Sequence, residues 1–286
     1  MFRRMDKIGV VGCGLMGAGI AEVCARAGSD VVVVESDSER AENGRGRLEK
    51  SLRRAQDRGK LDNADEVLDR IRVVTDMQTL ADREMVVEAI VEDEAAKVDL
   101  FRQLDAIVES PDAILASNTS SIPIMKLATV TKRPSHVLGV HFFNPVPVLK
   151  LVELVPSLMT DEATTERARD YVDGTLGKQA ITCQDRAGFV VNSLLIPFIL
   201  SAIRMYESGF ATAEDIDSGL VLGAAHPQGP LALADLIGLD TTMAVAQSLY
   251  EEFKEPLYAP PPLLQRMVDA GLLGRKTGRG FYTYDA

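Results

Sequence analysis

The chain has 286 residues, a formal net charge of −11 and a hydrophobic content of 46%. This length exceeds that of an ordinary single domain, so we expect two domains, and the composition is that of a folded chain. The net negative charge repels the phosphate backbone of DNA and RNA, which excludes nucleic acid as a general partner. A small anionic ligand is not excluded, because the backbone N–H groups of a local loop can bind phosphate.

The three cysteines, Cys13, Cys24 and Cys183, are odd in number and lack the spacing of a metal site. We therefore predict reduced thiols, no metal and a cytoplasmic protein. The apolar run over residues 8–28 follows basic residues and superficially resembles a signal peptide. We reject that interpretation because Glu22 and Arg26 interrupt the run. No other segment is long and apolar enough to span a membrane, so we expect no membrane partner.

Strands and helices are predicted to alternate through the first two-thirds of the chain. Strands over residues 7–12 and 30–35 flank a helix over 15–28, and the valine run in the second strand is typical of burial on both faces of a parallel sheet. The elements that follow are a helix over 38–58, strands over 71–75 and 85–90, a helix over 93–108, and strands over 113–116, 136–142 and 150–155. This alternation predicts a Rossmann-like, doubly wound α/β domain.

After Cys183 the pattern becomes almost purely helical. The predicted helices cover residues 189–208, 213–222, 231–236, 241–253 and 263–270, and Thr212 with Asp215 three residues later is typical of a helix start. A proline-rich connector over 258–262 and a glycine-rich, basic tail over 271–284 complete the chain. We place the boundary near Ala187, which predicts an α/β domain over 1–187 and an all-α domain over 188–286.

A glycine-rich motif joins the first predicted strand to the first predicted helix. It reads Gly12-Cys13-Gly14-Leu15-Met16-Gly17, which is G-x-G-x-x-G. The first glycine permits the tight turn, the second lets backbone approach a pyrophosphate, and the third lets helix and strand pack closely. The pyrophosphate is then expected at the helix N-terminus, where unpaired N–H groups and the helix dipole favour an anion.

The acidic residue expected about 20 residues beyond this motif is Glu35, at the end of the second predicted strand. A carboxylate there accepts hydrogen bonds from the adenosine ribose and repels a 2′-phosphate, so NAD is favoured over NADP. Asp37 is the competing acid, and it ranks lower because it lies beyond the strand. If the motif served only a plain turn, Glu35 would be a solvated strand end.

His141 is the candidate for a catalytic base, since histidine titrates near neutrality and can accept the proton of a hydroxyl group. It ends an apolar strand, whereas His136 begins one and His226 lies in a turn-like stretch. Glu153 interrupts the next apolar strand and needs a partner there. On a neighbouring strand it would orient the imidazole and stabilise the imidazolium. The alternatives are a core histidine and an edge-strand glutamate that faces solvent.

A polar cluster, Ser117-Asn118-Thr119-Ser120-Ser121, directly follows the strand over residues 113–116. At the carboxyl end of a strand such side chains can hold a nicotinamide or a substrate carbonyl. Taken alone, the cluster is better interpreted as a helix cap before Ile122.

Taken together, these segments resemble the 3-hydroxyacyl-CoA dehydrogenase family, of the 3-hydroxybutyryl-CoA dehydrogenase type. The segments that carry the resemblance are residues 12–17, 87–92, 117–121, 141–147, 151–153, 188–192, 229–231, 234–240 and 274–282. The resemblance implies an NAD-dependent interconversion of a (3S)-3-hydroxyacyl-CoA and the 3-oxoacyl-CoA. It also implies a Rossmann-like NAD-binding domain and a helical domain that contacts substrate and forms a homodimer.

The resemblance also implies roles for individual residues. Catalysis is assigned to His141 and Glu153, with Ser120 and Asn192 at the substrate's 3-oxygen. The implied NAD contacts are Gly12, Gly14, Leu15, Met16, Gly17, Glu35, Glu92, Lys97, Ser120, Asn144 and Lys276. The implied acyl-CoA contacts are Ser51, Arg58, Ser120, Asn144 and Asn192, with Lys60 as the alternative to Arg58.

Two residues depart from the family pattern, where relatives often have arginine in place of Ser193 and methionine in place of Gln228. Both lie in the predicted helical domain, so they bear on dimer packing and on the shape of the acyl pocket. Two rival functions remain open: a dehydrogenase of a CoA-free hydroxy acid or sugar acid, and a catalytically idle NAD-binding scaffold.

Overall fold

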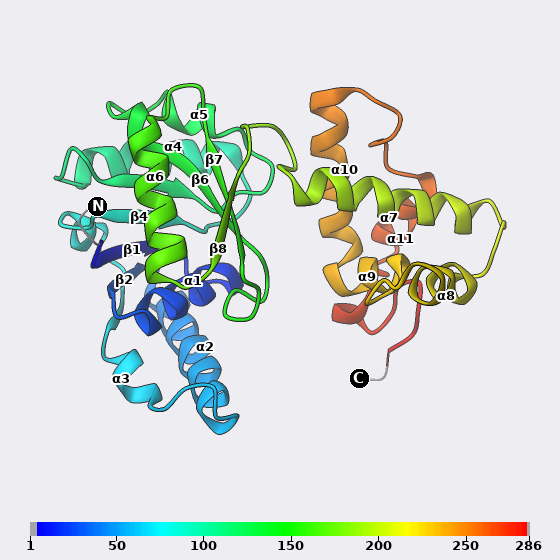
Figure 1. Cartoon of the computed structure of the whole chain (residues 1–286), viewed down its shortest axis with the longest axis horizontal. Helices are drawn as coiled ribbons and strands as arrows, with labels where there is room; N and C mark the ends of the chain where they lie inside the picture. The colour runs from blue at the N-terminus through cyan, green and yellow to red at the C-terminus, as the bar shows by residue number, and fades with distance from the viewer. Residues whose placement is uncertain (1–4, 285–286) are drawn as a thin grey trace. The chain divides into compact units, whose positions relative to one another are not determined.

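The computed structural model describes residues 5–284, and the chain divides into two compact units between Asp185 and Arg186 (Figure 1). The first unit is built on one eight-stranded sheet in the order β3-β2-β1-β4-β5-β6-β7-β8. Its strands are β1 (Lys7–Val11), β2 (Asp30–Val34), β3 (Ile71–Val74), β4 (Met85–Glu88), β5 (Ile114–Ser117), β6 (Val137–Phe142), β7 (Leu151–Pro156) and β8 (Gln179–Thr182).

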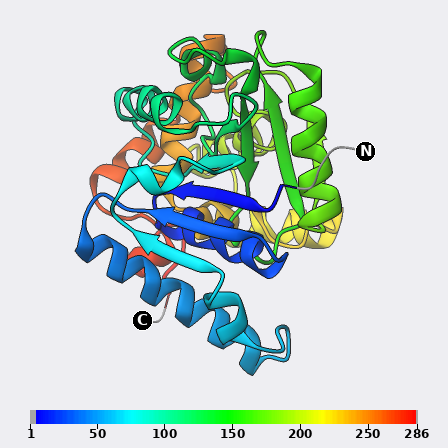
Figure 2. The same cartoon turned by 90° about the vertical axis from the view of Figure 1, so that its left-hand side faces the viewer.

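All neighbouring strands are parallel except β6 and β7, which are antiparallel. The strand order reverses between β1 and β4: the chain runs outward from β1 to β3 and then returns to the other side of β1. The carboxyl ends of strands at such a reversal form the crevice in which ligands bind. Figure 2 shows β1, β2 and β3, coloured blue to cyan, side by side.

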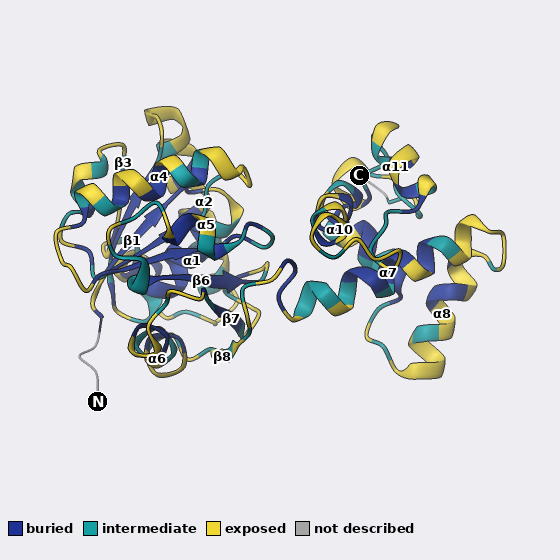
Figure 3. Cartoon of the chain, turned by 90° about the horizontal axis from the view of Figure 1, so that it is seen from above, coloured by how far each residue is buried: buried dark blue, intermediate teal, exposed yellow. Residues whose placement is uncertain are grey.

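Helices cover both faces of the sheet. The α-helices of this unit are α1 (Leu15–Arg26), α2 (Ser38–Asp57), α3 (Ala64–Leu68), α4 (Glu94–Ile107), α5 (Ile124–Ala128) and α6 (Glu162–Asp170). Apolar side chains of α1, α2, α3 and α6 share one core with one face of the sheet. Residues of α4 and α5, such as Phe101 and Leu127, are also fully buried (Figure 3). Burial on two faces explains the run of four buried valines that follows Asp30 in β2.

The second unit is helical and has its own apolar core. Its helices are α7 (Val191–Glu207), α8 (Ala213–Ala224), α9 (Pro230–Ile237), α10 (Leu239–Phe253) and α11 (Pro262–Asp269). Buried Asp217 of α8 accepts hydrogen bonds from the backbone of Leu231 and Ala232 at the start of α9. Buried Asp235 accepts from the backbone of Phe281 and Tyr282, which ties the C-terminal tail to α9.

The predicted fold class, a Rossmann-like domain followed by a helical domain, is confirmed. The sequence patterns missed α3, α5, α6 and β8 as elements. Helix α6 has few apolar side chains and buries Thr164, Thr165 and Ala168, so its amphipathic signal is weak. No helix within residues 5–284 is both long and apolar enough to cross a membrane.

Candidate active site

The glycine-rich loop connects β1 to α1 as the motif predicts. Gly12 adopts a φ of +93°, and a Cβ on it would lie 2.7 Å from the carbonyl oxygen of Ala89. A Cβ on Gly17 would lie 1.9 Å from the carbonyl oxygen of Gly12. The protein's own packing therefore requires both glycines. A Cβ on Gly14 would meet no protein atom within 4 Å, which leaves open space at the N-terminus of α1.

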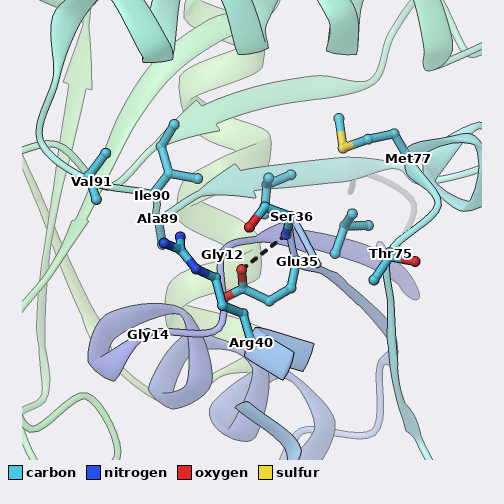
Figure 4. A pocket seen from close by; sticks show the side chains of 12 residues that line it. Gly12, Gly14, Glu35, Ser36, Arg40, Thr75, Met77, Ala89, Ile90 and Val91 are labelled. Carbon is cyan, nitrogen blue, oxygen red and sulfur yellow. Dashed lines mark hydrogen bonds between the residues drawn. The ribbon is translucent and has the colours of Figure 1, made fainter. Parts of the chain in front are cut away.

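A pocket of about 480 Å³ opens beside this loop (Figure 4). It is lined by Val11, Gly12, Gly14, Val34, Glu35, Ser36, Arg40, Thr75, Met77, Ala89, Ile90 and Val91. The pocket therefore spans the carboxyl ends of β1, β2, β3 and β4, on both sides of the reversal in strand order. Apolar walls with one carboxylate and one guanidinium suit a nucleoside that carries hydroxyl groups.

Glu35 lies in this pocket directly after β2. One carboxylate oxygen accepts a hydrogen bond of 2.5 Å from the backbone N–H of Cys13, and the other accepts one of 3.2 Å from the backbone N–H of Ser36. These bonds hold the carboxylate against the glycine loop. Asp37 instead caps α2 by accepting from the backbone N–H of Arg40, so its carboxylate has a structural partner.

Cys13, inside the same loop, is buried and free. Burial, together with the negative charge of Glu35, raises the pKa of its thiol to about 12, although Arg47 opposes the shift. The thiol therefore stays protonated at neutral pH, which argues against a nucleophilic role. Cys24 and Cys183 form no disulfide either within residues 5–284.

His141 and Glu153 are directly opposite each other on the antiparallel strands β6 and β7. The imidazole Nδ1 lies 2.8 Å from a carboxylate oxygen of Glu153. His141 is 7% exposed and Glu153 is 0% exposed. The alternative of a solvent-facing edge glutamate is wrong, because β8 pairs with the other side of β7 and makes it an internal strand.

Thr119 of the polar cluster after β5 accepts from the backbone N–H of Ile122 at 2.9 Å, as a cap before Ile122 would, but the cluster does not cap α5 itself. The first N–H groups of that helix, at Ile124 and Met125, donate to the carboxylate of Asp185. The cluster instead surrounds the carboxylate of Glu92, which accepts from Thr119 Oγ1 at 2.5 Å, from the backbone N–H of Ser120 at 3.1 Å, and from Ser121 Oγ at 3.0 Å. Glu92 thereby fixes the backbone that carries Ser120.

The Lys97 side chain is buried, and its ammonium lies 2.7 Å from Glu88 and 2.8 Å from Glu92. Burial favours the neutral form of Glu92, but the charge of Lys97 and hydrogen bonds from Lys97, Thr119 and Ser120 outweigh it and lower the pKa of this carboxyl. Glu92 is therefore an anion at neutral pH.

Of the five residues predicted to contact acyl-CoA, the two expected at its nucleotide, Ser51 and Arg58, lie on or directly after α2. Ser51 donates a hydrogen bond of 2.6 Å to the buried carboxylate of Glu22 on α1. Arg58 is the exposed C-cap residue of α2, and Lys60 is exposed close behind it. Asn144 is exposed in the loop between β6 and β7.

The remaining predicted site residues belong to the second unit. Asn192 is half-buried in the first turn of α7, and the Lys276 ammonium lies 2.5 Å from each carboxylate oxygen of Asp240. Of the two departures from the family pattern, Ser193 donates to the carbonyl oxygen of Phe189 at the start of α7. The side-chain nitrogen of Gln228 is buried without a hydrogen-bond partner among residues 5–284.

Sequence reasoning missed two contacts near the site. One is the ion pair of Glu88 with Lys97, and the other is made by Asn118. The Asn118 side chain accepts a hydrogen bond of 2.8 Å from the backbone N–H of Phe142, which joins the ends of β5 and β6 next to His141. Both residues stand within segments that carry the family resemblance, but their partners are distant in the sequence. No local pattern identifies such partners.

The Rossmann-like sheet, the glycine-rich loop and the pocket beside it define a dinucleotide-binding protein. Residues 7–186 match the family model described as the NAD-binding domain of 3-hydroxyacyl-CoA dehydrogenase, and residues 188–284 match the model of its C-terminal domain. The chain therefore belongs to the 3-hydroxyacyl-CoA dehydrogenase family, and it is an NAD-dependent 3-hydroxyacyl-CoA dehydrogenase.

Individual relatives resemble the chain over nearly its whole length. It is 57% identical to a 3-hydroxybutyryl-CoA dehydrogenase of Mycobacterium tuberculosis, over 98% of this chain and 99% of the relative. It is 41% identical to the mitochondrial hydroxyacyl-coenzyme A dehydrogenase of Homo sapiens, over 98% and 91%. A crystal structure of (S)-3-hydroxybutyryl-CoA dehydrogenase from Ralstonia eutropha matches with a TM-score of 0.93 and 45% identity, covering 99% of this chain and all of that one.

Proposed function

We propose that the physiological substrate pair is (3S)-3-hydroxybutyryl-CoA and acetoacetyl-CoA. The observation that carries the chemistry is the buried contact of 2.8 Å between His141 and Glu153, at the carboxyl end of β6. Relatives named for the four-carbon substrate at up to 57% identity support the acyl length. NAD, when bound, supplies the hydride acceptor.

In the proposed reaction His141 accepts the proton of the substrate's 3-hydroxyl group during oxidation and donates it back during reduction. Because Nδ1 faces Glu153, the proton moves to or from Nε2. Glu153 fixes the ring orientation and stabilises the imidazolium, since a buried carboxylate and a cation attract strongly at low dielectric. Burial of the pair excludes bulk water from this proton.

We propose binding roles for the remaining site residues. Ser120 and Asn192 hold the 3-oxygen, and Asn144 lies on the nicotinamide side. Ser51 and Arg58 bind the CoA nucleotide, with Lys60 as the alternative to Arg58. Gly12, Gly14, Leu15, Met16 and Gly17 hold the pyrophosphate, Glu35 the ribose, and Glu92, Lys97 and Lys276 the rest of the cofactor.

We further propose that residues 1–187 bind NAD and that residues 188–286 contribute to substrate binding and form a homodimer. Large apolar side chains of the second unit that are exposed in the single chain support this dimer, namely Leu194, Phe210 and Leu222. An apolar pocket of about 330 Å³ near Phe198 and Phe210 adds to that surface. We also propose a cytoplasmic location, which three cysteines without a disulfide in the described part of the chain support.

The first test mixes purified protein with acetoacetyl-CoA and NADH and follows the loss of absorbance of the reduced cofactor. We expect rapid oxidation, and slower turnover of longer 3-oxoacyl-CoA substrates. Faster turnover of a longer chain would reject the proposed acyl length. A CoA-free hydroxy acid or sugar acid turned over equally well would favour the rival dehydrogenase. Tight NADH binding without any turnover would favour the idle scaffold.

A second prediction concerns the choice of cofactor. We expect Glu35→Gln to raise the KM for NADH and to narrow the preference for NADH over NADPH, because the change removes the charge that repels a 2′-phosphate. The preference should fall by about 10-fold or more, since each 1.4 kcal/mol of lost discrimination is tenfold. Steady-state kinetics with both cofactors measures it, with Asp37→Asn as the matched control. If Asp37→Asn reduces the preference for NADH as strongly as Glu35→Gln does, the ribose contact cannot be assigned to Glu35 alone and passes to Asp37.

A further inference from the structure

Glu88, the last residue of β4, is a fully buried carboxylate to which the reaction above gives no role. It accepts hydrogen bonds from Lys97 Nζ at 2.7 Å, from Ser117 Oγ at 2.5 Å and from the backbone N–H of Ile90 at 2.8 Å. A buried carboxylate is costly unless it is paired and hydrogen-bonded. Here its partners come from α4, from β5 and from the loop after β4.

One of these bonds leads to the cofactor pocket. Ile90 lines the pocket of about 480 Å³ together with its neighbours Ala89 and Val91. In Figure 4 these residues form one side of the pocket, across from Thr75 and Met77. Glu88 accepts from the backbone N–H of Ile90, only two residues further along the chain. This bond therefore fixes the position of the pocket-lining residues Ala89, Ile90 and Val91 relative to β4.

Two other bonds lead to Ser120. Through Lys97, Glu88 is joined to Glu92, which accepts from the backbone N–H of Ser120. Through Ser117 it is joined to the same loop a second time, because Ser117 Oγ also accepts from the backbone N–H of Thr119 at 3.1 Å. A buried ion pair of this kind is rigid, and a displacement of about 1 Å at a reacting group can cost on the order of 100-fold in rate.

We propose that Glu88 is a positioning residue of this dehydrogenase. Through the backbone N–H of Ile90 it holds the side of the cofactor pocket that Ile90 lines, and through Lys97 and Ser117 it holds the loop that carries Ser120. The proposal rests on the proposed role of Ser120 at the substrate's 3-oxygen. Glu88 itself acts through other residues.

The test compares Glu88→Gln with Glu94→Gln. Glutamine preserves the size of Glu88 but turns one oxygen into a donor, which must then face Lys97, Ser117 or the Ile90 N–H. Glu94 begins the same helix α4, and its ion pair with Lys126 is half-exposed, so its loss should change little. Each variant is assayed well below its Tm, and activity is expressed per NADH-binding site counted by fluorescence titration.

For Glu88→Gln we expect a raised Kd for NADH and a kcat/KM for acetoacetyl-CoA lowered by about 10- to 100-fold. Glu94→Gln should match the parent. A Glu88→Gln variant with a lower Tm but with the parent's Kd, kcat and KM per folded molecule would show a purely structural role and overturn the proposal.

A double-mutant cycle with Glu92→Gln tests the route. If Glu88 acts through Lys97 and Glu92, the losses in kcat/KM caused by Glu88→Gln and Glu92→Gln are less than additive. Full additivity overturns that route. Should the parent enzyme be inert with acetoacetyl-CoA, the proposed function fails separately, and the Kd for NADH then decides: a weaker Kd in Glu88→Gln supports positioning, and an unchanged Kd overturns it.

Discussion

The His141→Ala enzyme is expected to reduce acetoacetyl-CoA about 100- to 10,000-fold more slowly than the parent, because a positioned general acid–base contributes that range. The imidazole is the group that hydrogen-bonds to Glu153 at the end of β6, and alanine leaves no group that can carry the proton at neutral pH. Stopped-flow measurement of a single turnover with saturating NADH reports the chemical step directly.

NADH affinity is the control for this variant. The predicted cofactor loop lies at β1 and the pocket at β1 to β4, whereas His141 belongs to β6, so the Kd for NADH should stay close to that of the parent. His136→Ala is a matched variant, because His136 hydrogen-bonds to Thr164 instead of Glu153. A His141→Ala enzyme that retains the parent's single-turnover rate would remove His141 from the mechanism.

The second large effect is expected for Glu153→Gln. Glutamine fits the space of Glu153 and can still accept from Nδ1, but it carries no charge to stabilise the imidazolium. We expect kcat to fall by about 100-fold or more, with the KM for acetoacetyl-CoA less affected. Steady-state kinetics with varied substrate separates the two constants.

Ser121→Ala is the comparison for this prediction. Ser121 donates one of several hydrogen bonds to Glu92, and the contacts of Thr119 and Ser120 remain when it is lost. We therefore expect a smaller loss than for Glu153→Gln. If Ser121→Ala impairs turnover more, the argument for a His–Glu pair fails. Thermal unfolding of each variant checks that the buried substitution at position 153 leaves a folded enzyme.

Much of this protein follows from the sequence alone, because strands, helices and glycine turns depend on residues a few positions apart. The valine run of β2, the glycine loop before α1 and the change to helices after Cys183 are local signals of that kind. They were sufficient for the fold class. His141 was selected as the candidate base by another local signal, its place at the end of an apolar strand. The family resemblance then supplied the reaction.

Tertiary structure decided which side chains meet. Glu153 is internal only because β8, a short strand with a weak pattern, pairs with β7. The link from Glu88 through Lys97 to Glu92 joins β4, α4 and the loop between them, and the backbone N–H of Ser120 connects it to the loop after β5. Such partners depend on sheet order and register, which arise from contacts between distant segments. Residue types and spacing therefore leave them undetermined.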